Sequence, residues 1–327
     1  MQKILVTGGA GYIGSTICNL LHKKNFKVFV IDNLSRGHVK LINKKSIFYK
    51  LNINQKEKIR KIIIKNNIDT IIHMAAFIRV DESIKYPKKY DTNNTIGTKL
   101  LIEAAKKTSV KRFIFSSSCS VYGKVNKAKL SEKDKTIPQS PYARSKLKSE
   151  KIIKKLCKKF KITSIILRYF NVVGAQIKTK PFTGQINNTG QLFQNIYFFL
   201  RNMKKDFFIF GTKLKTKDGT CIRDFIHVRD LAEIHYLSVK YAKKNISEVF
   251  NCGYGKGYSI KDVIKAFEKI SKKKIKAKKA PYKKGDIIKS ICDNKKLFKK
   301  LNWRPKHDSL NSMVRDTIRW FDHIHKK

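Results

Sequence analysis

The sequence lacks any long apolar run. No segment offers about twenty consecutive apolar residues, the length that a membrane-spanning helix needs. The most apolar stretch, residues 192–210, is interrupted by four charged residues, Arg201, Lys204, Lys205 and Asp206. The first residues, MQKILVTGG, lead directly into a strand-like segment and show no signal-peptide pattern. We therefore expect a cytoplasmic protein with no membrane partner.

The spacing of metal ligands is also missing. The six cysteines are scattered through the chain, and neither a CxxC pattern nor a Cys/His ligand pattern occurs. A zinc site or a disulfide framework needs such spacing. The eight histidines show no ligand spacing either. We expect no metal and six reduced, mostly packed thiols.

Acidic residues are scarce, because 23 Asp and Glu stand against 74 Lys and Arg, and the formal net charge is +51. Such a charge is typical of proteins that bind nucleic acid. However, the lysines are spread along the whole chain, and arginine, which binds bases and phosphates bidentately, is rare beside lysine. We expect no specific nucleic-acid partner. The charge reflects either biased composition or a surface for polyanions, and composition alone leaves both open.

The first 170 residues alternate between short apolar runs and longer stretches with helical periodicity. The expected strands are 3–7, 27–31, 47–51, 69–75, 112–117 and 163–170, and the expected helices are 12–24, 55–66, 91–108 and 141–160. Continuous apolar strands separated by helices predict a parallel sheet that is covered on both faces. The predicted fold class is therefore α/β, with a doubly wound, Rossmann-like sheet whose ligands lie beyond the carboxyl ends of the strands.

After residue 170 the periodicity changes. Residues 171–190 are rich in turn formers, and a mixture of helices and short strands follows. The expected helices are 191–204, 227–244, 259–271, 294–301 and 309–325, and the expected strands are 207–211, 248–253 and 274–280. We predict a dinucleotide-binding domain over 1–170 and a smaller, mixed α/β substrate domain over 171–327, with 222–253 returning to pack on the first domain.

A glycine-rich segment, TGGAGYIG (7–14), follows the first expected strand and opens the first expected helix. Glycines at 8, 11 and 14 allow a tight turn and let backbone amides approach a pyrophosphate, which the helix N-terminus stabilises. Asp32 ends the second strand, where an acid accepts the hydroxyls of the adenosine ribose and repels a 2′-phosphate. Arg36 lies nearby, and its positive charge could bind that phosphate. On balance we expect NAD rather than NADP.

Tyr142 and Lys146 are one helical turn apart in the segment SPYARSK (140–146). Ser140 is a suitable N-cap and Pro141 a favoured first helical residue, so we expect the helix to begin at this motif. A nearby ammonium group lowers the pKa of a tyrosine towards neutrality, as a general base requires.

The spacing by itself decides nothing, because Tyr236 and Lys240 have it too, within a long amphipathic helix. The context of the first pair is different. The segment RFIFSSSCSVYG (112–123) places a run of serines where the fifth strand ends, at the ligand edge of the sheet. A hydroxyl there can share a hydrogen bond with the substrate oxygen that Tyr142 deprotonates.

Together these segments resemble the extended short-chain dehydrogenase/reductase family, from residue 3 to about residue 325. Within this family they are most similar to the UDP-glucose (UDP-galactose) 4-epimerase branch. The motifs that carry the resemblance are TGGAGYIGS, DNLSRG, HMAAFIRVDES, NNTIGT, FSSSCSVYG, SPYARSK, RYFNVVGA and DGTCIRDFIHVRDLA.

The resemblance implies an NAD-dependent isomerase that oxidises C4 of a UDP-hexose transiently and reduces it again on the other face. Tyr142 would be the base, Lys146 its cationic neighbour and Ser118 the catalytic hydroxyl. The implied cofactor-binding residues are Gly8, Gly11, Tyr12, Ile13, Gly14, Asp32, Asn33, Ser35, Arg36, Gly37, Asn52, Ile53, Ala75, Ala76, Asn93, Lys146 and Phe170. The implied substrate-binding residues are Ser118, Asn171, Gln191, Arg223, Lys283, Asp286 and Ser290.

The sequence departs from the family pattern at several of these positions. Asn52 stands where an acid usually faces the adenine, Ile78 where some members have a lysine, and Lys283 where a second phosphate-binding arginine is expected. Gln191 replaces an expected Asn or His. Ser290 is small where strict glucose/galactose epimerases are bulky, so the resemblance extends to N-acetylhexosamine nucleotides.

Three other functions are compatible with parts of this pattern. A 4,6-dehydratase of the same family needs an acid beside the serine run, which here reads Ser118-Cys119-Ser120. A UDP-glucuronate epimerase or decarboxylase would need an extra cation, which the sequence cannot single out among so many lysines. A non-catalytic dinucleotide sensor that binds nucleic acid would have no reason to keep Tyr142, Lys146 and the serines together. The helices at 91–108 and 141–160 resemble those that pair in family dimers, so we expect a homodimer.

Overall fold

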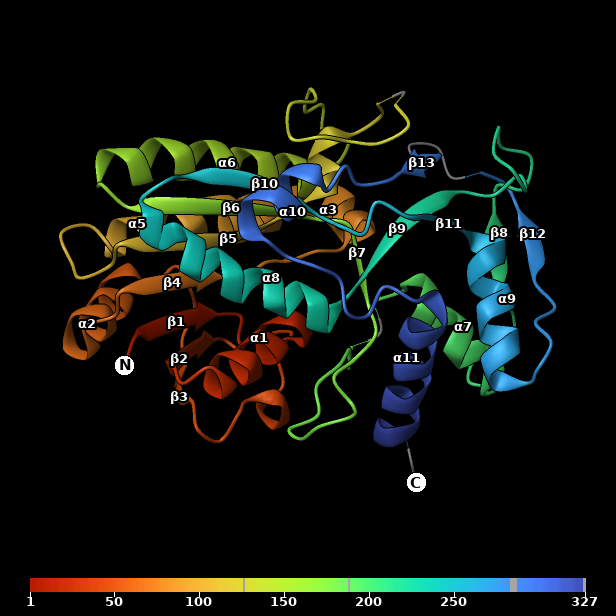
Figure 1. Ribbon diagram of the computed structural model, residues 1–327, viewed down its shortest axis with the longest axis horizontal. Helices are drawn as coiled ribbons and strands as arrows, with labels where there is room; N and C mark the ends of the chain where they lie inside the picture. The colour runs from red at the N-terminus through yellow and green to blue at the C-terminus, as the bar shows by residue number, and fades with distance from the viewer. Residues whose placement is uncertain (126, 188, 283–286, 326–327) are drawn as a thin grey trace.

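The computed structural model describes residues 1–125, 127–187, 189–282 and 287–325. Its centre is a seven-stranded parallel sheet in the order β10-β6-β5-β4-β1-β2-β3 (Figure 1). The strands are β1 (Lys3–Thr7), β2 (Lys27–Asp32), β3 (Ile47–Lys50), β4 (Thr70–His73), β5 (Arg112–Ser118), β6 (Thr163–Tyr169) and β10 (Glu248–Cys252). The strand order reverses between β1 and β4, so the doubly wound sheet predicted from the sequence is confirmed.

Helices cover both faces of this sheet. The helices α1 (Tyr12–Lys23) and α8 (Val228–Tyr241) pack against each other on one face, within the larger hydrophobic core. The helices α2 (Lys56–Asn66), α5 (Gly97–Ala104) and α6 (Pro141–Lys159) form a row with a separate core on the other face. The central strands are buried by both layers, which explains why their sequences are continuously apolar.

The segment predicted as one helix over 91–108 is more irregular than expected. After the short helices α3 (Val80–Lys85) and α4 (Pro87–Tyr90), residues Asp91–Ile96 form a π-helical turn, and α5 begins only at Gly97. Inside this turn the Asn94 side chain bonds both backbone groups of Phe77, at 2.9 and 3.0 Å. The π turn therefore lies against the segment that follows β4, and π turns are frequent at functional sites.

The smaller part of the molecule contains a second sheet that the sequence did not predict. Its strands are β7 (Asn171–Val173), β9 (Ile222–His227), β11 (Gly257–Ser259) and β13 (Lys289–Ser290), and β9 pairs with the other three. Three of these strands have two or three residues, which is too short for a periodic pattern. Strand β9 leads directly into α8, and the chain then returns to the central sheet as β10 (Figure 1).

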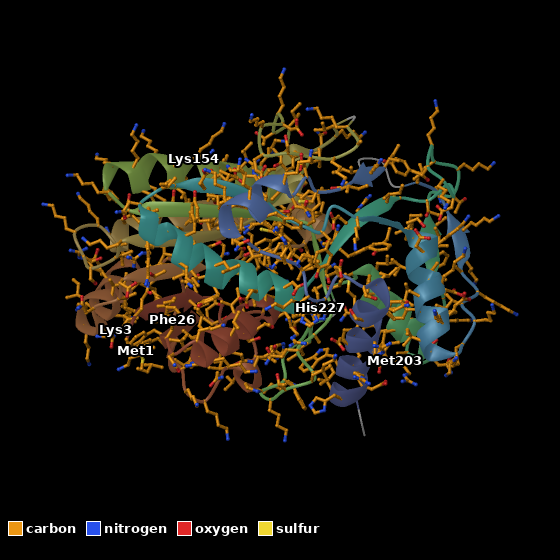
Figure 2. The ribbon with its side chains drawn as sticks, in the orientation of Figure 1. Met1, Lys3, Phe26, Lys154, Met203 and His227 are labelled. Carbon is orange, nitrogen blue, oxygen red and sulfur yellow. The ribbon has the colours of Figure 1, made fainter. Side chains whose placement is uncertain are left out.

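The remaining elements surround this second sheet. They are β8 (Phe208–Phe210), which pairs with β12 (Lys278–Ala280), and the helices α7 (Leu192–Leu200), α9 (Ile260–Ser271), α10 (Lys295–Leu301) and α11 (Leu310–Ile324). His227, at the start of α8, is fully buried, and its Nε2 lies 3.3 Å from Asp316 of α11. This contact joins the C-terminal helix to the start of α8, where Figure 2 labels His227.

Figure 2 also shows side chains that end in nitrogen projecting around the outline of the molecule, in agreement with lysines spread along the whole chain. Among the described residues, no helix combines the length and the apolar character that crossing a membrane would require.

Candidate active site

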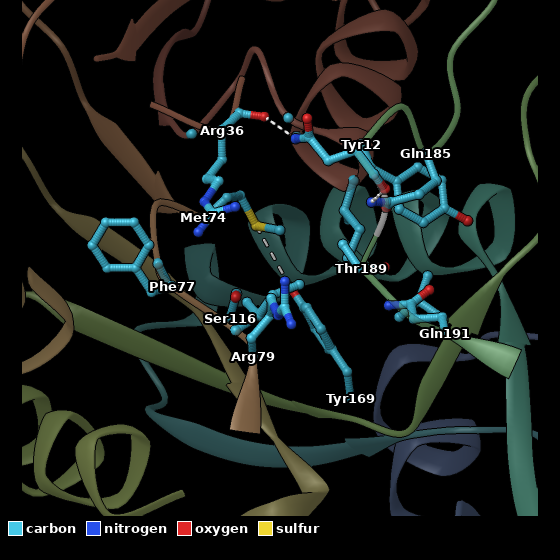
Figure 3. Close-up of a pocket in the computed structure, with 18 of the residues that line it drawn as sticks. Tyr12, Arg36, Met74, Phe77, Arg79, Ser116, Tyr169, Gln185, Thr189 and Gln191 are labelled. Carbon is cyan, nitrogen blue, oxygen red and sulfur yellow. Dashed lines mark hydrogen bonds between the residues drawn. The ribbon is translucent and has the colours of Figure 1, made fainter. Parts of the chain in front are cut away.

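A cavity of about 520 Å³ opens beyond the carboxyl ends of the central strands and reaches into the smaller part (Figure 3). The two parts of the chain supply its wall together. The predicted site residues in this wall are Gly8, Gly11, Tyr12, Ile13, Gly14, Asp32, Asn33, Ser35, Arg36, Gly37, Ile53, Ala75, Ala76, Asn93, Ser118, Tyr142, Lys146, Phe170, Asn171, Gln191 and Arg223.

The glycine-rich loop between β1 and α1 is packed so tightly that side chains cannot enter it. Gly8 has φ +71°, and a Cβ there would lie 2.7 Å from the backbone nitrogen of Ala75. A Cβ on Gly14 would lie 2.2 Å from the carbonyl oxygen of Gly8. Helix α1 begins after Gly11 without a side-chain cap, so its first backbone amides remain available to a ligand. This cradle fits the diphosphate of a dinucleotide.

Asp32 ends β2 beside this loop and is almost completely buried. Its carboxylate accepts hydrogen bonds from the backbone nitrogens of Ala10 at 3.1 Å and Leu34 at 2.9 Å. Burial raises the pKa of Asp32, and these two hydrogen bonds oppose the shift. The carboxylate oxygens can still accept from ribose hydroxyls.

Arg36, whose positive charge could also bind the 2′-phosphate of NADP, forms an ion pair with an acid. Its guanidinium donates to both carboxylate oxygens of Glu82, at 3.0 and 3.1 Å. Glu82 also accepts from Lys89, and its hydrogen bond with Lys89 contributes most to lowering its pKa, so it stays ionised. A 2′-phosphate would have to compete with this carboxylate for Arg36. The arrangement therefore favours a dinucleotide without that phosphate.

The helix that carries the tyrosine and the lysine begins as the sequence predicted. The Ser140 hydroxyl accepts a hydrogen bond from the Ala143 nitrogen at 3.2 Å, and Pro141 is the first helical residue of α6. Tyr142 in the first turn therefore faces the cavity at the level where β5 ends. Burial raises the pKa of Tyr142 to about 12, although its hydrogen bond with Ser118 opposes this shift. This is the opposite of the lowered pKa expected from the sequence.

The reason lies in where Lys146 points. Its Nζ donates to the backbone oxygen of Ser116 at 2.7 Å and lies 4.9 Å from the centre of the Phe115 ring. The side chain is 2% exposed, and burial lowers the pKa of Lys146 to about 7, while Glu150 opposes the shift. The lysine is thus held at the end of β5 by a backbone carbonyl, and burial, not its charge, dominates the pKa of Tyr142.

A buried ion pair supports this helix, and sequence reasoning missed it. Glu150, one turn beyond Lys146, accepts from Arg168 of β6 at 3.0 and 2.7 Å and from Ser117 of β5 at 2.5 Å. Arg168 also donates to the Tyr122 hydroxyl at 2.9 Å. These bonds join α6 to the ends of β5 and β6, so Ser118 and Tyr142 stay together. In the sequence, the sign of this ion pair was an acid four residues after Lys146, on the same face of the expected helix.

Residues of the smaller part contribute further polar groups to the cavity wall. The Asn171 side chain donates to the Asp224 backbone oxygen at 2.9 Å, and Arg223 donates to the Ile222 backbone oxygen at 3.0 Å. Gln191 stands at the start of α7. Arg223 lines the cavity, and its planar guanidinium suits phosphate oxygens.

Two predicted residues lie outside the cavity wall. The Asn52 side chain accepts a hydrogen bond from the Asn54 nitrogen at 2.9 Å, so it stabilises the turn before α2. Ser290 is 3% exposed and lies behind Cys119, with 4.0 Å between its hydroxyl and the thiol sulfur. The predicted residues Lys283 and Asp286 lie outside the described residues.

The cavity wall also contains residues that the sequence did not single out. The most informative are Met74, Phe77, Glu82, Ser116, Tyr169 and Asn187 (Figure 3 labels four of them). Asn187 donates to the backbone oxygen of Arg36 at 2.5 Å, and its side-chain oxygen lies 2.9 Å from His38 Nε2. These bonds tie the segment after β7 across the glycine-rich side of the cavity. No local pattern reveals such a long-range contact.

Three comparisons place this architecture among known proteins. Residues 4–253 match the family model described as NAD dependent epimerase/dehydratase family. The UDP-glucose 4-epimerase of Halalkalibacterium halodurans is 37% identical over 327 residues, which cover 99% of this chain and 97% of that protein.

Solved structures agree with the sequence comparison. The UDP-glucose-4-epimerase of Stenotrophomonas maltophila, solved with NAD and formylated UDP-arabinopyranose, superposes with a TM-score of 0.95 at 30% identity and covers 100% of this chain and 99% of that one. The UDP-Glc/GlcNAc 4-epimerase of Campylobacter jejuni superposes with a TM-score of 0.87 at 36% identity, covering 99% of this chain and 100% of that one.

Proposed function

Because the chain belongs to the NAD-dependent epimerase/dehydratase family, we propose that it interconverts UDP-glucose and UDP-galactose through transient oxidation at C4 with tightly bound NAD. One observation carries the proposal. Tyr142, Ser118 and Lys146 line the same cavity as the glycine-rich loop and Asp32, and Arg223 and Asn171 line it from the smaller part. Dinucleotide and nucleotide-sugar can therefore meet at the tyrosine.

We assign the following roles to the residues of the chain. Tyr142 accepts the proton of the sugar 4-hydroxyl and later returns it, and Ser118 shares the hydrogen bond. Lys146 holds its ammonium at the end of β5, beside the place where the reacting groups meet. Bound NAD⁺ supplies the hydride acceptor and a positive charge. Burial raises the pKa of Tyr142 to about 12, so the chain alone disfavours the phenolate. A positive charge near the phenol would favour the phenolate and lower this pKa.

The wall of the cavity favours epimerisation over dehydration. A 4,6-dehydratase must protonate a leaving hydroxyl with an acid close to the serine run. Among the described residues of the wall, the carboxylates are Asp32 and Glu82, and both belong to the side that holds Arg36. Glu150, which accepts from Ser117 beside Ser118, lies outside the described wall, and its carboxylate is paired with Arg168.

The individual binding residues are part of the proposal. The cofactor would be held by the residues of the glycine-rich side, together with Phe170 and Lys146. The UDP-sugar would be held by Ser118, Asn171, Gln191, Arg223, Lys283, Asp286 and Ser290. We also propose that N-acetylhexosamine nucleotides are accepted, as the name of the Campylobacter relative says of that protein. Ser290 lies outside the cavity wall, and its support for this proposal is its small size 4.0 Å from Cys119, the neighbour of the wall residue Ser118.

We further propose a division into a dinucleotide domain over 1–170 and a substrate domain over 171–327, with 222–253 returning to the first. The return of the chain as α8 and β10 to the central sheet supports this division. We propose a homodimer that forms through the helices within 91–108 and 141–160 and works in the cytoplasm.

The test is incubation of the purified chain with UDP-galactose, and separately with UDP-GalNAc, without added NAD⁺, followed by chromatographic analysis of the products. We expect UDP-glucose from the first and UDP-GlcNAc from the second. Conversion of UDP-galactose alone would leave the epimerase function intact and refute the proposed acceptance of N-acetyl sugars. No conversion of either, in a chain shown to contain NAD, would refute the proposed function.

A further inference from the structure

A buried histidine stands directly behind one residue of the cavity wall. Tyr169, the last residue of β6, lines the cavity, and its hydroxyl lies 2.5 Å from Nε2 of His235 in α8. The two rings meet edge to face, with 5.5 Å between their centres. His235 is completely buried and does not reach the cavity itself. The roles proposed above leave this histidine unused.

The surroundings of His235 decide which partner donates the proton. Its Nδ1 lies 2.9 Å from the backbone oxygen of Leu231, which can only accept a hydrogen bond. Nδ1 therefore carries a hydrogen. Burial lowers the pKa of His235 to about 4, so the ring is neutral at physiological pH and Nε2 has no hydrogen. Nε2 is thus an acceptor, and the Tyr169 hydroxyl donates to it.

This bond determines what Tyr169 offers to the cavity. A phenol hydroxyl has one hydrogen and two acceptor sites. The hydrogen is used by His235, because an imidazole nitrogen at 2.5 Å is a better acceptor than the Met74 sulfur at 3.6 Å. Ser116 makes a further hydrogen bond to Tyr169. The oxygen that remains accessible from the cavity can accept a hydrogen bond and cannot donate one.

Tyr169 belongs to the end of the cavity where the chemistry is proposed to occur, since it neighbours Ser116 and lies near Tyr142. Asp32 and Arg36 belong to the glycine-rich end. A dinucleotide with its adenosine end at Asp32 that extended through the cavity would bring its nicotinamide towards Tyr169. The only hydrogen-bond donor on the nicotinamide ring system is the amide NH₂ group.

We propose that His235 is a positioning residue that holds Tyr169 as a hydrogen-bond acceptor for the nicotinamide amide. The pair thereby selects a dinucleotide whose ring carries an N–H donor and fixes the orientation of that ring beside Tyr142. This inference rests on the use of NAD in the proposed function.

The test compares the binding of NAD⁺ with that of 3-acetylpyridine adenine dinucleotide, which has a methyl ketone in place of the amide and no N–H donor. Dissociation constants are measured by calorimetry with the full chain purified free of dinucleotide. We expect the unchanged protein to prefer NAD⁺ by roughly fivefold, since a neutral hydrogen bond contributes about 1 kcal/mol. Both Tyr169→Phe and His235→Phe should lose this preference.

Tyr236→Phe is the matched control, because it removes a tyrosine hydroxyl from the position next to His235 without touching the cavity wall. It should keep the preference for NAD⁺. A purely structural role of His235 would weaken the binding of both dinucleotides equally and leave their ratio unchanged. That result in His235→Phe would overturn the inference, as would an unchanged ratio in Tyr169→Phe.

The failure of this inference is separable from the failure of the proposed function. Equal affinity of the unchanged protein for both dinucleotides refutes only the selection by Tyr169 and His235. If neither dinucleotide binds, the proposed function fails together with it. Should His235→Phe not fold, Tyr169→Phe decides the question, since it keeps the ring and removes only the hydroxyl.

Discussion

The chain contains two tyrosine–lysine pairs with identical spacing, and the structure gives them different surroundings. Tyr142 and Lys146 begin α6, and both line the cavity at the carboxyl end of the central sheet. Tyr236 and Lys240 lie in the second half of α8, away from that edge. Lys146 is 2% exposed, whereas Lys240 is an exposed residue.

The contacts of the two lysines show the same contrast. Lys146 donates to a backbone carbonyl at the end of β5. Lys240 instead lies over the ring of its own partner, with its Nζ 5.7 Å from the centre of the Tyr236 ring, and Lys24 lies over the same ring at 5.0 Å. Spacing thus places two side chains on one helical face, but the start of the helix relative to the sheet decides whether this face meets a ligand or water.

The largest expected effect separates the two tyrosines. Tyr142→Phe removes the proposed base and should lower the turnover of UDP-galactose by a factor of about 10² to 10⁴, because general-base catalysis contributes this much. Tyr236→Phe should leave turnover unchanged. Initial rates of both variants, measured beside the unchanged protein, test the contrast. Equal rates in the two variants would remove the reason for treating the pairs differently.

The next effect separates the two lysines. Lys146→Met should lower turnover about tenfold or more, since it removes the cationic side chain that the proposed mechanism places beside the reacting groups, whereas Lys240→Met should not. Lys146→Met should also stabilise the fold at pH 7, by about 1–4 kcal/mol, because a buried ionisable group is replaced by an apolar one. Urea unfolding of both variants measures this.

The pH dependence of this stabilisation has a definite sign. The folded pKa of Lys146 is about 7, below its ordinary value of 10.5, so the unfolded chain binds more protons between these two pH values. The contribution of Lys146 therefore makes the unchanged protein more stable as pH rises through this window. The advantage of Lys146→Met should shrink between pH 7 and pH 9. A constant advantage would show that Lys146 does not titrate with a lowered pKa.

The smallest effects belong to the second pair. Lys240→Met and Tyr236→Phe should each change the free energy of unfolding by about 0.5 kcal/mol or less, because a cation over a ring at the surface contributes little. Chemical unfolding at low and at physiological salt measures both. A loss of several kcal/mol in either variant would show that this part of α8 contributes more to the fold than its exposure suggests.

Much of the fold followed from local patterns. The six strands of the first half and the helices expected at 12–24, 55–66 and 141–160 were predicted within a few residues, since apolar runs of parallel strands and helical periodicity are strong signals. The short strands around β9 were missed, because two or three residues carry no period. The π turn at 91–96 was missed because its sequence is compatible with an ordinary helix.

The candidate site was predictable to the extent that each residue belongs to a local motif. The structure gathers the glycine-rich loop, Asp32, the serine run and Tyr142 around one cavity. It leaves Asn52 and Ser290 outside the wall, because their side chains bond or pack elsewhere. Residues that act through distant partners were missed: Glu150 showed only its spacing from Lys146, and His235 gave no local signal.

The sequence by itself determined the doubly wound sheet, the dinucleotide loop and the helix start at Ser140, because these depend on neighbouring residues and on backbone preferences. Only the tertiary structure decided the electrostatics of the site. The pKa of Tyr142 lies above its usual value and that of Lys146 below it, because burial penalises the charged form of both. Burial depends on every segment that closes the cavity, and no single motif contains that information.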